Sequence, residues 1–428
     1  MTLKGVLLAR LTVHMHHVDA AFLAVCLVLI LFIGSFLTGP VTAFAAFAYS
    51  TTSATNASTT NTVGKEEIPS QVKNFILVQI VNKSKAAIVI GFVDPNGTRI
   101  FSFGNMSTAH NVPVNQSTLF NIGSITKTFT TLLLADMVKQ GLVNLTDPIE
   151  KYLPTSVKVP QFNGQKITLE DLATHTSGLP EFPSDSLDNN DELKSNYSAA
   201  QLYQALSNTT LSRAPGSQFE YSNFGSGLLG HILSVKAGVP YEQLVKDRIL
   251  DVLGMNDTKI ALSQNEINDS FPVGHKGGKE IVLPPIPTVL AGAGAFRSTV
   301  PDLLKYISAN LGLIHTQLDD AMQIQHLIRH PVGINYSVNY SNYVGLGWFI
   351  ITDFGSETIF HQGQRPGWDA FAGFNPTKQI GIVAMCSCDR TDAGIIRLGL
   401  VLLHLEGTDI LTNTTSTAAS QNSTSEIE

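Results

Sequence analysis

Residues 121–127 read Asn-Ile-Gly-Ser-Ile-Thr-Lys, which places Ser124 three positions before Lys127. The residues that follow, 128–138, are apolar enough to form a buried helix. Residues three apart on a helix share one face, and a serine at the helix start faces free backbone N–H groups. A lysine held there in apolar surroundings loses solvation and tends to deprotonate, so it can take the hydroxyl proton. The stretch therefore predicts a serine nucleophile activated by a lysine.

The Ser-x-x-Lys spacing is not specific on its own. Ser70 and Lys73 have the same spacing in a polar stretch just after the predicted linker, and we interpret Ser70 as a solvated helix start. The alternative interpretation of Ser124 is an ordinary N-cap serine. The assignment of Ser124 as a nucleophile therefore depends on further motifs.

The composition and the first residues indicate an exported protein without nucleic-acid partners. The chain has 428 residues, 43% of them hydrophobic, and a net charge of −7. This acidic balance argues against nucleic-acid binding, which usually requires a basic patch. Lys4 and Arg10 precede an apolar block at 20–37, and small residues follow it. The pattern is typical of a secretory signal peptide, and its length also fits an uncleaved membrane anchor.

Glycosylation sequons support export independently. Fourteen of the 26 asparagines stand in Asn-x-Ser/Thr, with x other than proline. We interpret this excess as a surface exposed to N-glycosylation machinery, which makes the protein secreted or anchored outside the cytoplasm.

Four segments follow from composition. We expect a signal peptide or N-terminal membrane anchor at 1–48, a Ser/Thr/Asn-rich linker at 49–64, one folded body at 65–408 and a disordered polar tail at 409–428. The body is long enough to bury a large core or two lobes.

The order of elements in the body predicts an α+β fold. Hydrophobic patterns predict elements at both ends: a helix at 72–81, strands at 86–93, 98–104, 345–352, 358–362, 370–374 and 379–387, and a last helix at 393–405. The middle is mostly helical, with long loops such as 181–196. We therefore expect an antiparallel sheet flanked by the terminal helices, a mostly helical lobe, and an active site in the cleft between them.

Of the three cysteines, Cys26 lies in the apolar block. Cys386 and Cys388 are two positions apart on one predicted strand face, an arrangement poorly suited to a mutual bond. We expect both to be buried as small hydrophobic residues, without a disulfide.

Two further motifs contain residues suited to acyl transfer. In Tyr221-Ser222-Asn223, the tyrosine can relay a proton if a cation lowers its pKa, and the asparagine amide can hold both the lysine and a substrate carbonyl. A second copy at 340–342 runs into a strand, and we interpret it as a strand lead-in. In the segment 361–364, His-Gln-Gly-Gln, glycine allows the substrate backbone to approach closely and the next N–H can stabilise an oxyanion.

In their order and separation, the motifs at 124–127, 221–223 and 361–363 resemble the beta-lactamase-related serine hydrolase family. This family includes class C beta-lactamases, D-alanyl-D-alanine carboxypeptidases, D-aminopeptidases and related esterases. The resemblance extends over roughly residues 68–405 and includes the Leu-Glu-Asp-Leu-Ala-Thr-His-Thr-Ser-Gly-Leu-Pro segment at 169–180. It implies a penicillin-binding-protein-like fold without a cofactor or a metal.

The resemblance also implies a role for each matched residue. Ser124 would be the acylated nucleophile, Lys127 its base and Tyr221 a general base or acid, while Asn223 would orient the substrate and the lysine. The backbone N–H groups of Ser124 and Gln364 would form the oxyanion hole. His361 and Gly363 would contact substrate, and His175 would only shape the cleft. Which of Lys127 and Tyr221 takes the proton first stays open.

One departure from the family bears on the substrate. Beta-lactamases and carboxypeptidases of this family usually have Lys-Thr-Gly at the third motif, where this chain has His361. Because a histidine is only partly charged near neutral pH, we expect weak or pH-dependent carboxylate binding and no efficient beta-lactamase activity. The leading prediction is an exported hydrolase of small peptides, of the D-amino-acid or carboxypeptidase type. The alternatives are a carboxylesterase and a catalytically silent penicillin-recognition-like binding module.

Overall fold

The computed structural model describes residues 70–82, 86–108, 111–188, 193–333, 341–353, 356–388 and 394–404. The predicted signal or anchor segment, the linker and the polar tail lie outside the described residues. None of the helices in these ranges is long and apolar enough to cross a bilayer.

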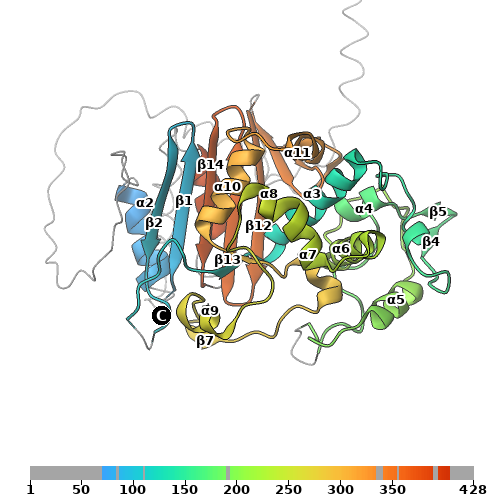
Figure 1. Cartoon of the computed structure of the whole chain (residues 1–428), viewed down its shortest axis with the longest axis horizontal. Helices are drawn as coiled ribbons and strands as arrows, with labels where there is room; N and C mark the ends of the chain where they lie inside the picture. Colours follow the sequence, from blue (N-terminus) through green and yellow to red (C-terminus); the bar gives the residue numbers. More distant parts are fainter. Residues whose placement is uncertain are drawn as a thin grey trace, which may run out of the picture. The chain divides into compact units, whose positions relative to one another are not determined.

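An eight-stranded antiparallel sheet is assembled from both ends of the chain (Figure 1). The strand order is β2-β1-β14-β13-β12-β11-β10-β9, and Ile88 of β1 lies opposite Cys386 of β14. The strands are β1 (Ile88–Asp94), β2 (Gly97–Phe103), β9 (His330–Pro331), β10 (Ser341–Val344), β11 (Phe349–Asp353), β12 (Ser356–Arg365), β13 (Trp368–Asn375) and β14 (Ile380–Cys386). The predicted α+β class with an antiparallel sheet is confirmed.

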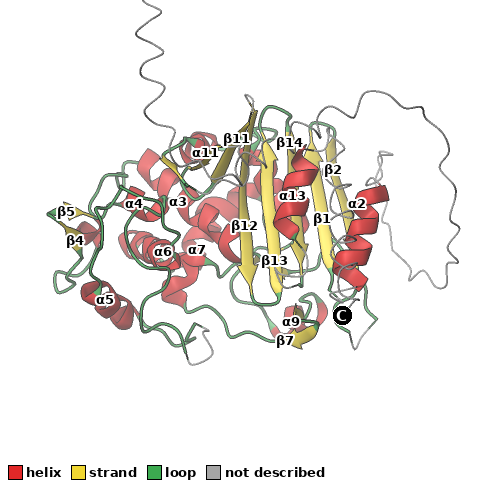
Figure 2. Cartoon of the chain, turned by 180° about the vertical axis from the view of Figure 1, so that it is seen from behind, coloured by secondary structure: helices red, strands yellow, loops and turns green. Residues whose placement is uncertain are grey.

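Helices cover both faces of this sheet. Helix α2 (Ser70–Phe75), which continues as the π-helix η1 (Ile76–Asn82), and helix α13 (Ile395–His404) lie on one face (Figure 2). Helix α10 (Val300–Asn310) lies on the other face (Figure 1), where Gly91 of β1 lets it pack closely. All eight residues of β13 are buried, which explains why this strand reads as a nearly continuous apolar run.

A mostly helical lobe packs beside the sheet. At its centre is helix α3 (Thr126–Lys139), whose residues 126–137 are all buried, and α3 contacts both α6 (Asn223–Ala237) and α11 (Asp319–His326). The other helices of the described residues are α4 (Leu169–Ala173), α5 (Ala199–Asn208), α7 (Tyr241–Val245), α8 (Asp251–Leu253), α9 (Gln264–Asp269), η2 (Gly123–Ile125), η3 (Ile149–Tyr152), η4 (Lys246–Leu250) and η5 (Thr288–Ala293). Three short two-stranded pairings complete the fold: β3 (Phe120–Asn121) with β8 (Arg297–Ser298), β4 (Gln161–Phe162) with β5 (Gln165–Lys166), and β6 (Gly274–Lys276) with β7 (Lys279–Ile281).

Side-chain caps determine where several of these helices begin. Helix α4 starts with a reciprocal capping box between Thr168 and Asp171, and α5 and α9 start in the same way. Helix α6 starts where the Ser222 hydroxyl accepts a hydrogen bond from the Gly225 N–H at 2.8 Å. This cap fixes the chain direction at the Tyr-Ser-Asn motif.

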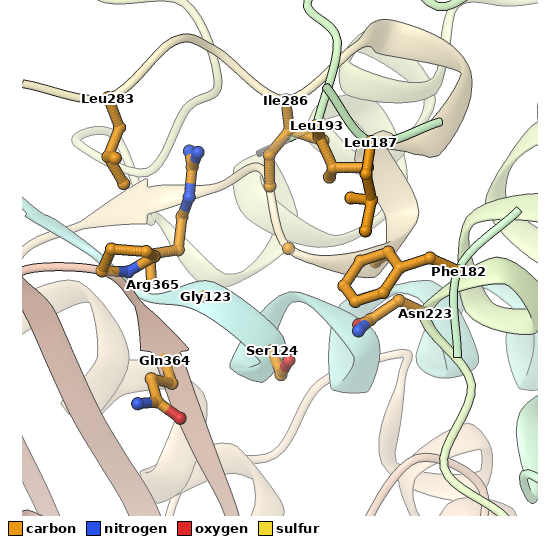
Figure 3. A pocket seen from close by; sticks show the side chains of 13 residues that line it. Gly123, Ser124, Phe182, Leu187, Leu193, Asn223, Leu283, Ile286, Gln364 and Arg365 are labelled. Atoms are coloured by element: carbon orange, nitrogen blue, oxygen red, sulfur yellow. The ribbon is translucent and has the colours of Figure 1, made fainter. Parts of the chain in front are cut away.

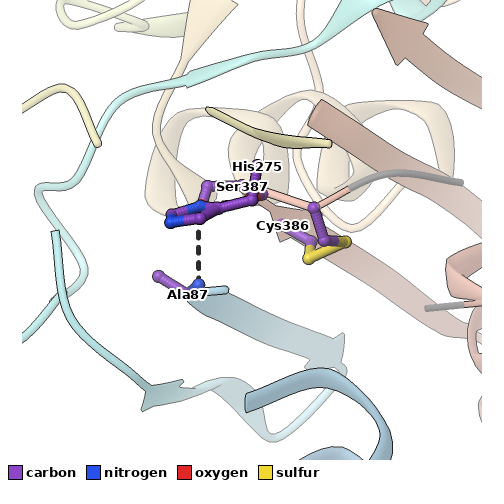
Figure 4. Close-up of a disulfide and its surroundings, with 5 residues drawn as sticks. Ala87, His275, Cys386 and Ser387 are labelled. Atoms are coloured by element: carbon purple, nitrogen blue, oxygen red, sulfur yellow. Dashed lines mark hydrogen bonds between the residues drawn. A yellow bond between two sulfur atoms is a disulfide. The ribbon is translucent and has the colours of Figure 1, made fainter. Parts of the chain in front are cut away.

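The structure corrects two predictions about local backbone. The predicted strand at 345–352 begins only at Phe349, because residues 345–348 form a turn in which Gly347 has φ +72°. The prediction of unpaired cysteines is wrong: Cys386 and Cys388 form a disulfide (Figure 4). The strand ends at Cys386 and the chain bends, which brings the two Cα atoms within 5.2 Å, a separation that a disulfide spans.

Candidate active site

Ser124 lies in η2, a 3₁₀ turn that leads directly into α3. The turn needs Gly123, which has φ +47° and packs so tightly that a Cβ would lie 2.5 Å from the backbone nitrogen of Gln364. As a result, the start of α3 lies directly against strand β12.

Lys127 lies in the first turn of α3 and is 1% exposed. Its Nζ is 2.9 Å from the Ser124 Oγ, 2.7 Å from the Asn223 Oδ1 and 2.6 Å from the Ala293 carbonyl oxygen. Burial lowers the pKa of Lys127 to about 7, against an opposing contribution from the Glu181 carboxylate. A large fraction of Lys127 is therefore neutral at physiological pH, with its nitrogen beside the serine hydroxyl.

Tyr221 completes the cluster around Ser124. Its hydroxyl hydrogen-bonds Ser124, and the Lys127 Nζ lies 4.8 Å from the centre of its ring. Burial raises the pKa of Tyr221 above its ordinary value, whereas the hydrogen bond to Ser124 lowers it. Tyr221 is therefore protonated at neutral pH, and the phenol is suited to donate a proton.

His175 packs against the Tyr221 ring. Its ring lies 4.4 Å from the Tyr221 ring, centre to centre, and its Nδ1 accepts a hydrogen bond from the Ser222 N–H at 3.1 Å. His175 has φ +58° and is 2% exposed. Its pKa lies well below 6.5, mainly because of burial and also because of nearby Lys127. A neutral, buried ring in this position supports the Tyr-Ser-Asn loop.

The segment that follows the His-Thr-Ser-Gly loop is tied to the Tyr-Ser-Asn motif by three hydrogen bonds. The Ser222 hydroxyl donates to the Pro180 carbonyl at 2.7 Å, and the Phe224 N–H donates to the Glu181 carbonyl at 2.9 Å. The Asn223 Nδ2 donates to the Glu181 Oε1 at 3.4 Å. Glu181 is thus connected through Asn223 to Lys127.

The third motif brings its backbone against Ser124. A Cβ on Gly363 would lie 1.8 Å from the Ile122 carbonyl oxygen, so only glycine allows this approach. Together with the contact between Gly123 and Gln364, this places the Ser124 and Gln364 peptides on neighbouring segments. Such an arrangement can stabilise an oxyanion through two backbone N–H groups.

His361 differs from the expectation of partial charge. Its side chain is 1% exposed, and burial, with nearby Lys127, lowers its pKa to about 3. Its Nε2 has no hydrogen-bond partner among the described residues. His361 is therefore neutral throughout the physiological pH range and does not supply a cation for a substrate carboxylate.

A pocket of about 160 Å³ opens over Ser124 (Figure 3). Of the predicted site residues, Ser124, Asn223 and Gln364 line it, whereas Lys127, Tyr221, His361 and Gly363 do not. The other lining residues are Gly123, Phe182, Leu187, Leu193, Leu283, Ile286, Ala293, Gly294, Arg365 and Pro366. The sequence reasoning missed the apolar wall formed by Phe182, Leu187, Leu193, Leu283 and Ile286, because these residues lie on loops without a periodic pattern.

The second copies of the motifs lie apart from this cluster. Ser70 and Lys73 are exposed on α2, which covers the sheet. Ser341 and Asn342 lie on β10, whereas Tyr340 is outside the described residues. In the described ranges, no three His, Cys, Asp or Glu side chains are grouped as metal ligands.

Comparison with known proteins gives consistent matches over the described body. A family model described as Beta-lactamase matches residues 81–406. The chain is 31% identical over 300 residues to the D-alanyl-D-alanine-carboxypeptidase/endopeptidase AmpH of Escherichia coli (strain K12), covering 68% of this chain and 76% of that protein. It is 29% identical over 320 residues to a beta-lactamase of the same organism, covering 67% and 80%.

Solved structures share the fold. A beta-lactamase/D-alanine carboxypeptidase from Yersinia pestis complexed with citrate superposes with a TM-score of 0.67 at 24% identity, over 78% of this chain and 97% of that one. An octameric penicillin-binding protein homologue from Pyrococcus abyssi superposes with a TM-score of 0.68 at 23% identity, over 78% and 76%.

Proposed function

Because the chain belongs to the beta-lactamase family of serine hydrolases, we propose that it cleaves an amide or ester bond through an acyl-enzyme on Ser124. One observation supports this most strongly: a buried lysine with a pKa of about 7 has its nitrogen 2.9 Å from the serine hydroxyl. That arrangement supplies the base that a serine nucleophile requires.

The proposed reaction has two steps. The Ser124 Oγ attacks the substrate carbonyl carbon while the Lys127 Nζ takes the hydroxyl proton, and the oxyanion accepts hydrogen bonds from the Ser124 and Gln364 N–H groups. The carbonyl–nitrogen or carbonyl–oxygen bond then breaks, and Tyr221 protonates the leaving amine or alcohol. Water hydrolyses the acyl ester by the reverse proton path. The raised pKa of Tyr221 favours this division of roles, with Lys127 as the first base.

The proposed substrate is a small peptide, as the carboxypeptidase relative suggests. The protein would act outside the cytoplasm, since the first residues read as an export segment. A carboxylesterase is the second candidate. The apolar walls formed by Phe182, Leu187, Leu193, Leu283 and Ile286 favour it because they suit an apolar acyl chain.

The test is acylation of the body, residues 65–408, by a fluorescent penicillin and by a p-nitrophenyl ester, monitored by intact mass beside a Ser124→Ala control. A stable penicillin adduct on the wild type alone supports the carboxypeptidase-like reading. Ester turnover without an adduct, lost in Ser124→Ala, supports an esterase or aminopeptidase. If neither reagent modifies the folded wild type, the proposal fails and a silent binding module replaces it.

A further inference from the structure

The Glu181 carboxylate lies beside Asn223, which lines the pocket. Glu181 is exposed, and its Oε1 lies 3.4 Å from the Asn223 Nδ2. Its backbone carbonyl accepts the Phe224 N–H at the start of α6, so the position of the residue is fixed by the same motif that holds Asn223. The backbone of Glu181 is therefore fixed beside the pocket-lining Asn223, and its carboxylate accepts a hydrogen bond from the Asn223 amide.

In the part of the chain that the structure describes, no ion pair within 4.0 Å involves Glu181, whereas Glu170 pairs with Arg329 at 2.6 Å and Glu220 pairs with Arg213. Lys127 interacts with Glu181 electrostatically, but its Nζ is buried and directed to Ser124, Asn223 and a backbone carbonyl. With respect to the residues that the structure describes, a cationic group of a bound substrate would therefore be the first direct counter-ion of Glu181.

An apolar surface adjoins the carboxylate. The Phe182 ring, one residue after Glu181, lies over Asn223 in the pocket, with Leu187 and Leu193 beside it (Figure 3). A substrate whose carbonyl carbon is at Ser124 would thus meet an amide, an apolar wall and a negative charge on the same side. An amino acid with a free amino group and an apolar side chain has the matching groups in this order.

We propose that Glu181 binds the free α-ammonium of the substrate's acyl residue, so that the enzyme releases single amino acids from the N-termini of short peptides. This inference rests on the proposed acylation of Ser124. In acylation, the Ser124 Oγ bonds to the carbonyl carbon of the N-terminal residue and the peptide C–N bond breaks. The leaving amine takes one proton, and water then frees the amino acid with its ammonium unchanged.

The test compares matched anilides that differ only at the amino group. Leucine p-nitroanilide, its N-acetyl form and its N-succinyl form, each as both enantiomers, are assayed with the wild type, Glu181→Gln, Glu181→Lys and the control Glu150→Gln. Glu150 is an exposed carboxylate on η3 that pairs with Lys166 and does not line the pocket. The quantity compared is the ratio of kcat/KM for the free amine to kcat/KM for the acetyl form. An effect of Glu181 on Asn223 or Lys127 that changes both values equally cancels in this ratio.

We expect this ratio to be high in the wild type and in Glu150→Gln. It should fall about tenfold or more in Glu181→Gln, the scale of one charge-assisted hydrogen bond. In Glu181→Lys, the N-succinyl substrate should become the preferred one. An equal ratio in wild type and Glu181→Gln overturns the proposal.

Failure of this inference is distinguishable from failure of the proposed function. If no anilide is turned over while Ser124 is still acylated by a p-nitrophenyl ester, recognition of an amine by Glu181 is refuted and the hydrolase assignment stands. If no reagent acylates Ser124 in the folded protein, the proposed function itself is refuted.

Discussion

The pH dependence of acylation tests the central role of Lys127. An exposed lysine with a pKa of about 10.5 is neutral in roughly 0.03% of molecules at pH 7, whereas a pKa of about 7 makes about half of them neutral. Burial thus increases the population of the basic form on the order of a thousandfold. Since only the neutral amine accepts the Ser124 proton, kcat/KM should rise with pH and level off above pH 7. It should be about tenfold below the plateau at pH 6 and about a hundredfold below it at pH 5.

The assay is the initial rate of p-nitrophenyl ester hydrolysis between pH 5 and 9, at substrate concentrations well below KM and corrected with Ser124→Ala. Two variants separate the candidate groups. Lys127→Arg keeps a positive charge but has no accessible neutral form, so it should lose at least about a thousandfold in kcat/KM. His361→Asn should keep the midpoint near pH 7, because the wild-type imidazole has a pKa of about 3 and does not titrate in this range.

Two results would refute this reasoning. A midpoint near pH 10 would mean that Lys127 keeps an ordinary pKa and is charged in the resting enzyme. Loss of the pH 7 midpoint in His361→Asn, with the fold intact by circular dichroism, would assign the titration to the histidine instead.

Three further predictions concern the scaffold around the site. Gly363→Ala should lower kcat for the same ester by about a hundredfold or more, because the new Cβ would push β12 away from η2 by more than 1 Å. An unchanged kcat would argue against the oxyanion hole. Replacing Cys386 and Cys388 with alanine should lower the free energy of unfolding, measured by urea titration, by about 1.5 kcal/mol or more without reducing activity. Loss of activity in a variant that is still fully folded would contradict this prediction. His175→Ala should lower the free energy of unfolding by about 1–3 kcal/mol, since the buried Ser222 N–H loses its acceptor. It should also lower kcat more than it raises KM. An unchanged free energy of unfolding would show that this hydrogen bond is dispensable.

The local part of the site was predictable from sequence. Ser124 and Lys127 are three residues apart at the start of one buried helix, so their contact follows from helix geometry. The strands at both chain ends were predictable for the same reason, since their apolar patterns have a fixed period. The chemistry of Asn223 suits it to hold Lys127, but its contact with a lysine 96 residues earlier could be expected only from the resemblance to a family.

The remaining features depend on how loops pack, which leaves no period in the sequence. Glu181 and Phe182 lie in a polar loop, and hydrogen bonds between this loop and the Tyr-Ser-Asn motif hold it beside Asn223. The charge of His361 depends on burial by residues distant in sequence, so its pKa could not be deduced from residue type. The disulfide was missed because a bend after Cys386 shortens the distance that an extended strand would impose.

The pairing of β1 with β14 has a consequence for synthesis on the ribosome. Ala87 and Ser387, which share a backbone-to-hydroxyl hydrogen bond beside this pairing, are 300 residues apart. At about 5–20 residues per second, the first hairpin waits on the order of 15–60 s for its partner strand to emerge. During that interval the buried residues of β1 have no sheet to cover them, and the open strand edge can pair with other chains. Until its last strands are made, a nascent chain of this fold therefore leaves the β14-facing edge of β1 unpaired.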